Sequence, residues 1–133
     1  MRLSLAREAL AGCKSTLGPT HPDTLCNLNN LATLLEAQGK HREAEPLFRE
    51  ALAGFKSTLG PTHPDTLMSL TNLASLLQAQ GKLHEAEPLA RQALAGARIA
   101  LGPSHPTTLN CMRTLAVVRR KLEREAKAAV TTA

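Results

Sequence analysis

The chain has 133 residues, with 16 Lys and Arg against 11 Asp and Glu, so its formal net charge is +5. Hydrophobic residues make up 43% of it, yet only Phe48 and Phe55 are aromatic, and most of the others are Leu or Ala. Because strands favour β-branched and aromatic residues whereas Leu, Ala, Glu and Lys favour helices, the composition predicts an all-α fold and excludes a β-rich one.

The cysteines and the hydropathy limit the class of protein further. Cys13, Cys26 and Cys111 are odd in number and lack C-x-x-C spacing, which argues against a disulfide framework or a structural zinc site. No apolar run approaches the roughly 20 residues of a membrane span. Arg7 and Glu8 interrupt the N-terminal stretch where a signal peptide would be apolar. We therefore expect a cytoplasmic protein that does not bind membranes.

Residues 1–17 are expected to form the first helix, and they match residues 43–59 at 11 of 17 positions. This match makes them the second helix of a partial repeat. Without a preceding helix, Leu3, Leu5 and Leu10 would leave an apolar strip uncovered. We expect either an array longer than this chain or burial of the strip by a second chain, which would give a homo-oligomer.

Two full repeats follow, residues 18–59 and 60–101, and they are identical at 29 of 42 positions. Each opens with the linker GPTHPDTL, whose second proline suits the first turn of a helix. The first helix of each repeat carries an apolar stripe at helical spacing and should stop at Gly39 or Gly81. A second amphipathic helix follows, with Pro46 or Pro88 expected near its start.

Residues 102–133 begin a third copy that keeps only 8 of the 21 positions from Gly102 to Leu122. Glu123 stands where the turn glycine would be, so this helix is expected to continue towards Ala129 as a polar cap. Its stretch 113–127 holds six Lys and Arg against two Glu, a net charge of +4 that accounts for most of the total. This charge favours an acidic partner, and a plain solvated face is the alternative.

No helix is long enough to bury its own stripe, so stacking of helix pairs side by side predicts an α-solenoid. Gly12, Gly54 and Gly96 recur at the 42-residue period although glycine costs about 1 kcal/mol in a helix relative to alanine. We expect them to mark close contacts with the next helix.

The linker histidines, His21, His63 and His105, are the obvious candidates for a metal site. Stacked repeats would hold them about 20 Å apart by helix dimensions, and zinc–nitrogen bonds are about 2 Å long, so they cannot share an ion. We interpret them as turn residues, and His41 and His84 as surface polar residues. No nucleophile, metalloprotease or phosphate-loop motif is present, so neither an enzyme nor a cofactor is expected.

The stretch from Asn27 to Leu52, NLNNLATLLEAQGKHREAEPLFREAL, resembles a tetratricopeptide repeat in the spacing of Leu28, Leu31, Ala32 and Gly39 and of the Ala and Phe residues that follow. The 42-residue unit, with its LGPxHPDTL linker and QGKxxEAEPL turn, is similar to the kinesin light chain subtype. The resemblance covers about nine-tenths of the chain.

That resemblance implies a non-catalytic module that binds an extended peptide in a groove lined by the first helix of each pair, and cargo or adaptor binding of the kinesin light chain kind. Asn30 and Asn72 resemble asparagines that bind a peptide backbone in that subtype. The resemblance places Asn29, Asn30, Thr33, Asn72, Ser75, Gln78, Arg113 and Arg120 in this groove. Cys26, Glu36, Met68, Thr71, Asn110, Thr114 and Val117 complete the implied lining.

The expected partner is a protein or peptide with acidic groups, because Arg113, Arg120 and Lys121 would place positive charge at the C-terminal end of the groove. Nucleic acid is not expected, since stacking platforms and known binding motifs are missing. Solvated or helix-bracing roles for the groove residues remain open. An architectural or self-associating repeat fragment without a peptide ligand is the alternative function.

Overall fold

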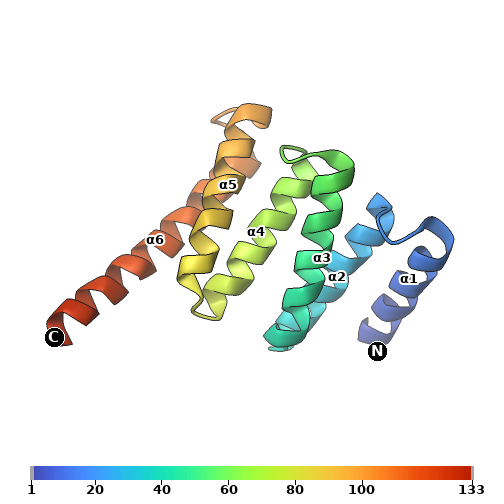
Figure 1. The fold of residues 1–133 in the computed structure, drawn as a ribbon, viewed down its shortest axis with the longest axis horizontal. Helices are drawn as coiled ribbons and strands as arrows, with labels where there is room; N and C mark the ends of the chain where they lie inside the picture. The colour runs from blue at the N-terminus through green and yellow to red at the C-terminus, as the bar shows by residue number, and fades with distance from the viewer. Residues whose placement is uncertain (1, 133) are drawn as a thin grey trace. The chain divides into compact units, whose positions relative to one another are not determined.

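The computed structural model describes residues 2–132, so the outermost residues of the first and last predicted segments, Met1 and Ala133, lie outside the described part. The described chain is built from helices and turns and has no strand. It folds into two compact units, Met1–Ser69 and Leu70–Ala133, and the boundary between them falls inside one helix. In chain order the helices are α1 (Arg2–Leu17), α2 (Pro22–Ala37), α3 (His41–Leu59), α4 (Pro64–Ala79), α5 (Leu83–Leu101) and α6 (Pro106–Thr132), as Figure 1 shows.

In the first unit, α2 packs against both α1 and α3. The stripe predicted for α2 is buried except for the half-buried Leu34, and the two phenylalanines of α3 are also fully buried. The apolar strip expected on α1 is only partly open. Leu5 is exposed and Leu3 half-buried, but Leu10 is buried, so the prediction that Leu10 is uncovered was wrong. Leu10 is covered because α1 already packs on α2 through one of its faces.

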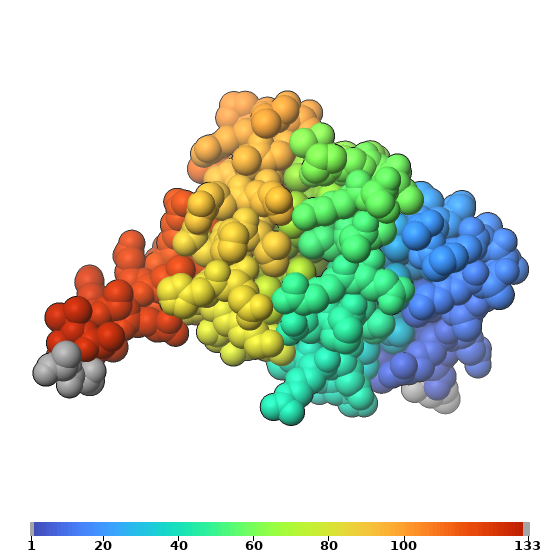
Figure 2. Space-filling model, viewed as in Figure 1, coloured from blue at the N-terminus to red at the C-terminus, as the bar shows by residue number. Residues whose placement is uncertain are grey.

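In the second unit, α5 packs along α6, and the buried side of α6 carries Thr108, Cys111, Leu115 and Val118. These positions follow each other at intervals of three or four residues, which places them on one face of a helix. The helix continues without a break to Thr132 and extends past the N-terminal end of α5 (Figures 1 and 2). The absence of a turn glycine at Glu123 explains this extension.

The histidines of the linkers cap the helices that follow them. The Nδ1 atom of His21 accepts a hydrogen bond from the backbone N–H of Asp23 at 3.1 Å, and His63 and His105 do the same at the starts of α4 and α6. Each histidine therefore caps one of the N–H groups that a helix start leaves without a partner. In the first linker, the Thr24 hydroxyl also donates to the Gly18 carbonyl at 2.8 Å and closes the turn. The interpretation of the histidines as turn residues is confirmed and gains a mechanism.

The other turns confirm one prediction and correct another. Gly39 and Gly81 follow the ends of α2 and α4 with φ near 79°, in the left-handed region where glycine is favoured. Pro46 and Pro88, however, are interior residues of α3 and α5 rather than residues near their starts. Because α3 already begins at His41, Pro46 is its sixth residue and removes one backbone hydrogen bond of the helix.

The recurring glycines differ from each other. A Cβ atom at Gly54 would lie 2.5 Å from Cδ2 of Leu25, so any side chain there would force Leu25 to shift. The predicted close contact is confirmed there, although its partner belongs to the preceding helix rather than the next one. At Gly12 the prediction was wrong, because a Cβ atom would meet nothing within 4 Å among the described atoms.

Candidate binding site

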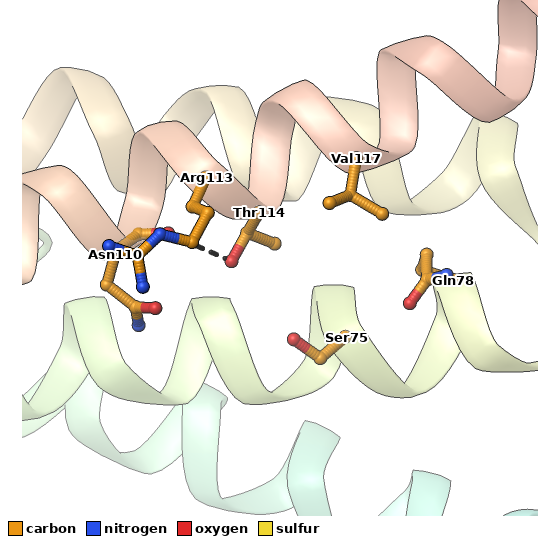
Figure 3. Close-up of a pocket in the computed structure, with 6 residues that line it drawn as sticks. All are labelled: Ser75, Gln78, Asn110, Arg113, Thr114 and Val117. Atoms are coloured by element: carbon orange, nitrogen blue, oxygen red, sulfur yellow. Dashed lines mark hydrogen bonds between the residues drawn. The ribbon is translucent and has the colours of Figure 1, made fainter.

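A cleft of about 180 Å³ lies between α4 and α6 in the second unit. Figure 3 shows side chains of α4 facing side chains of α6 across it. The two helices occupy the same place in consecutive repeats, and residues three or four apart on each of them share one face. The cleft is lined by Ser75, Gln78, Asn110, Arg113, Thr114 and Val117. All six belong to the lining that the sequence implied.

The chemistry of this cleft is polar, with one cation. Gln78 and Asn110 carry amides, which both donate and accept hydrogen bonds, and Arg113 is exposed and contributes a guanidinium group. The Thr114 hydroxyl donates a hydrogen bond to the Asn110 carbonyl of its own helix at 3.1 Å (Figure 3), so it does not donate to a ligand in this arrangement. Val117 adds an apolar wall. Amides and a guanidinium group together suit a peptide backbone and a carboxylate.

A second, larger cleft of about 340 Å³ adjoins the first at Gln78. It lies between the turn after α4 and the middle of α6, and its charged residues are Lys121, Arg124 and Glu125. Lys121 and Arg124 are one helical turn apart and therefore share a face. Arg124 was not among the site residues predicted from the sequence, although its spacing from Lys121 could have indicated it. Leu83, which begins α5, was missed as well.

Two predicted residues of the second unit lie outside these clefts. Arg120 is exposed but lines neither of them, since the next residue, Lys121, turns to that side of α6. Asn72 is half-buried on α4 and is likewise not part of the lining. Their predicted contact with a peptide stays a prediction.

In the first unit, Asn29 has a structural role. It is 6% exposed, and its Nδ2 atom donates to the Ser69 hydroxyl at 3.2 Å, which links α2 to α4. Its Oδ1 atom is buried without a hydrogen-bond partner. The Thr33 hydroxyl donates back to the Asn29 carbonyl at 2.8 Å, whereas the Asn30 side chain is exposed. Of the three predicted residues on α2, Asn29 thus braces the fold and Asn30 is the most available for binding.

The ionisable groups near this face of α2 are perturbed by burial. Partial burial raises the pKa of Glu36, an effect that nearby His41 opposes. Burial also raises the pKa of the Cys26 thiol, with smaller contributions from Asp65 and Asp23. His41 was predicted to be a surface residue, but it is half-buried, and its Nδ1 atom is buried without a partner. The prediction for His84 holds, since this residue is exposed.

Within residues 2–132, no three His, Cys, Asp or Glu side chains lie close enough together to hold a metal ion. No helix in this range is long and apolar enough to cross a membrane. The three cysteines are free thiols.

Comparison with known proteins identifies the repeat. The family model of the tetratricopeptide repeat matches residues 3–57, 48–99 and 65–130. The chain therefore belongs to the tetratricopeptide repeat family. Its 42-residue unit and its structural neighbours place it in the kinesin light chain-like subtype, and its fold class is the predicted all-α solenoid of helix pairs.

Two crystal structures of the "kinesin light chain nearly identical TPR-like repeats" of Podosopora anserina, one of them a single-substitution variant, are similar to the chain. They match with TM-scores of 0.85 and 0.82 at 30% and 31% identity, covering 95% and 87% of this chain. BtubC (BKLC) from P. vanneervenii shares the fold, with a TM-score of 0.73 at 18% identity over 98% of this chain. The chain spans 60%, 55% and 56% of the lengths of these three proteins. No curated protein sequence matches it significantly.

Proposed function

We propose that the cleft between α4 and α6 binds an acidic, extended segment of a partner protein, so that the chain acts as a non-catalytic interaction module. Repeats of this family form protein-interaction modules. The observation that carries the proposal is the cleft itself, because its six lining residues are those that the repeat register implied.

The charges favour an acidic ligand. Arg113 can bind a carboxylate through two parallel hydrogen bonds. Lys121 and Arg124 continue the positive charge along α6 into the adjoining cleft, where Glu125 is the only opposing charge among its lining residues. The amides of Gln78 and Asn110 are available for the backbone of an extended peptide. Nucleic acid fits less well, since the only two aromatic residues of the chain, Phe48 and Phe55, are buried and cannot stack on bases.

The finer proposal is cargo or adaptor binding of the kinesin light chain kind in the cytoplasm. The subtype of the repeat supports the first part, and the three free thiols support a reducing compartment. The competing candidate is an architectural spacer without a peptide ligand. The two differ in one measurable property, which is whether the polar cleft binds anything.

A peptide-array screen followed by fluorescence anisotropy distinguishes them. Acidic peptides should bind, and Arg113→Glu should weaken binding by about tenfold or more because it replaces an attraction with a repulsion. Arg98→Glu, which changes the same charge on an exposed site of α5 outside both clefts, is the matched control and should leave affinity within about twofold. Absence of binding by all peptides, or equal effects of the two variants, would support the spacer.

A further inference from the structure

Helix α6 has an apolar face that the structure leaves open. Leu109 and Met112 are 45% and 42% exposed, whereas Leu25 and Leu28, at the same positions of the repeat in α2, are at most 1% exposed. In α2 this face is covered by α3. The same face of α6 continues at Ala116 and ends at the charged residue Arg119, and both are also exposed.

Helix α1 presents the complementary surface. It aligns with α3 through the identical stretch ALAG, which runs from Ala9 to Gly12 in α1 and from Ala51 to Gly54 in α3. At Gly54 the missing side chain makes room for Leu25, but the equivalent space at Gly12 is empty. Ala9 is exposed, whereas Ala51 is buried. Helix α1 thus has the open space beside its glycine, here called the notch, into which a leucine fits in a complete helix pair. Helix α6 has the leucine that would occupy such a notch.

We propose that α1 of a second copy of this chain docks on α6 and completes a helix pair, as α3 does with α2. In this arrangement Leu109 enters the space beside Gly12 of the other copy, in the way that Leu25 lies beside Gly54. Because the helices of such a pair are antiparallel, Met112, one turn further along α6, packs near Ala9, one turn back along α1. The contact is independent of the peptide cleft, which lies on another face of α6.

The contact joins two different surfaces, so it is heterologous and can add further copies at both free faces. The proposed contact is least favourable at the end of the helix pair that holds Arg119 and Arg2. Arg119 replaces Leu35, and Arg2 replaces Ala44, so two arginines would lie at the end where α2 and α3 bury apolar side chains. Their repulsion is screened by salt. Association should therefore strengthen as ionic strength rises, which is opposite to the behaviour of a contact held by ion pairs.

The test is sedimentation velocity on the 133-residue chain over a wide range of concentrations, with circular dichroism to check folding. The wild-type chain should associate reversibly. Gly12→Leu fills the notch and should weaken association by about tenfold or more, while its own helix gains propensity. Ala11→Leu is the control, because the equivalent residue, Ala53, stays exposed on α3. Arg119→Leu, which restores the residue found at Leu35, should strengthen association.

A mixing experiment tests the geometry. Gly12→Leu retains an intact α6 face and Leu109→Glu retains an intact α1 face, so each variant alone should be monomeric and their mixture should form a one-to-one dimer. A monomeric wild-type chain at all concentrations would overturn the proposal and would point to a different segment as the occupant of these faces. Association that is indifferent to Gly12→Leu, or a mixture that stays monomeric, would overturn it as well.

Discussion

Helices α2 and α6 hold the same position in the repeat, yet one face of α6 is open where that of α2 is enclosed. Both begin with a proline after a histidine cap, and both are anchored by a buried threonine near the first turn. The stripe of α2 that starts at Leu25 is enclosed, whereas that of α6 is open from Leu109 onwards. The repeat register therefore sets the backbone and its caps, whereas the enclosure of a face depends on the helix packed against it.

The largest expected effect separates the enclosed stripe from the open one. Leu28→Ala removes a fully buried side chain and should lower the free energy of unfolding by about 2–5 kcal/mol. Met112→Ala, at the equivalent position of α6, should cost less than about 1 kcal/mol at concentrations where the chain is monomeric, because the side chain is already in contact with solvent. Urea unfolding followed by circular dichroism measures both. Equal decreases in the free energy of unfolding would contradict the difference in enclosure between the two helices.

An intermediate effect is expected at the two glycines. Gly54→Ala places a methyl group against Leu25 and should destabilise the chain by about 1–3 kcal/mol. Gly12→Ala meets open space and should stabilise α1 by up to about 1 kcal/mol through its higher helix propensity. Thermal unfolding of the two variants measures the difference in sign. A gain in stability at Gly54 would show that the α2–α3 contact does not require glycine.

The smallest effect concerns Glu36, whose equivalent in α6 is the exposed Arg120. Burial raises the pKa of the folded-state carboxyl, so the folded state binds the proton more tightly than the unfolded state does. This contribution to stability is complete below the unfolded pKa and is lost as pH rises through the folded pKa. Glu36→Gln introduces the residue found at the equivalent position of the next repeat, Gln78. The stability of this variant relative to wild type should therefore increase as pH rises.

The gain from Glu36→Gln should stay below about 0.5 kcal/mol. It is measured by urea unfolding at a series of pH values from acid to neutral. His41, the neighbour that lowers this pKa, is left unchanged in both proteins. If the variant became less stable relative to wild type as pH rises, this would contradict the raised pKa of Glu36.

The sequence predicted what depends on local pattern. Helical stripes, the 42-residue period and the glycines that follow α2 and α4 all depend on nearby residues. The six residues that line the α4–α6 cleft are among those that the resemblance to the family implied. The features that the sequence could not predict depend on contacts between distant residues. The burial of Asn29 depends on Ser69, forty residues away. The choice of Lys121 over Arg120 depends on the rotation of α6 against its neighbours, which no spacing within one helix reports.

The most direct test of the peptide-binding role is a titration of the isotope-labelled chain with an acidic peptide, followed by amide chemical shifts in NMR spectra. We expect the largest shifts at the residues of the α4–α6 cleft, above all Ser75, Gln78, Asn110 and Arg113, and we expect these shifts to vanish in Arg113→Glu. Shifts confined to α1 and the Leu109 face of α6, or none at saturating peptide, would contradict it.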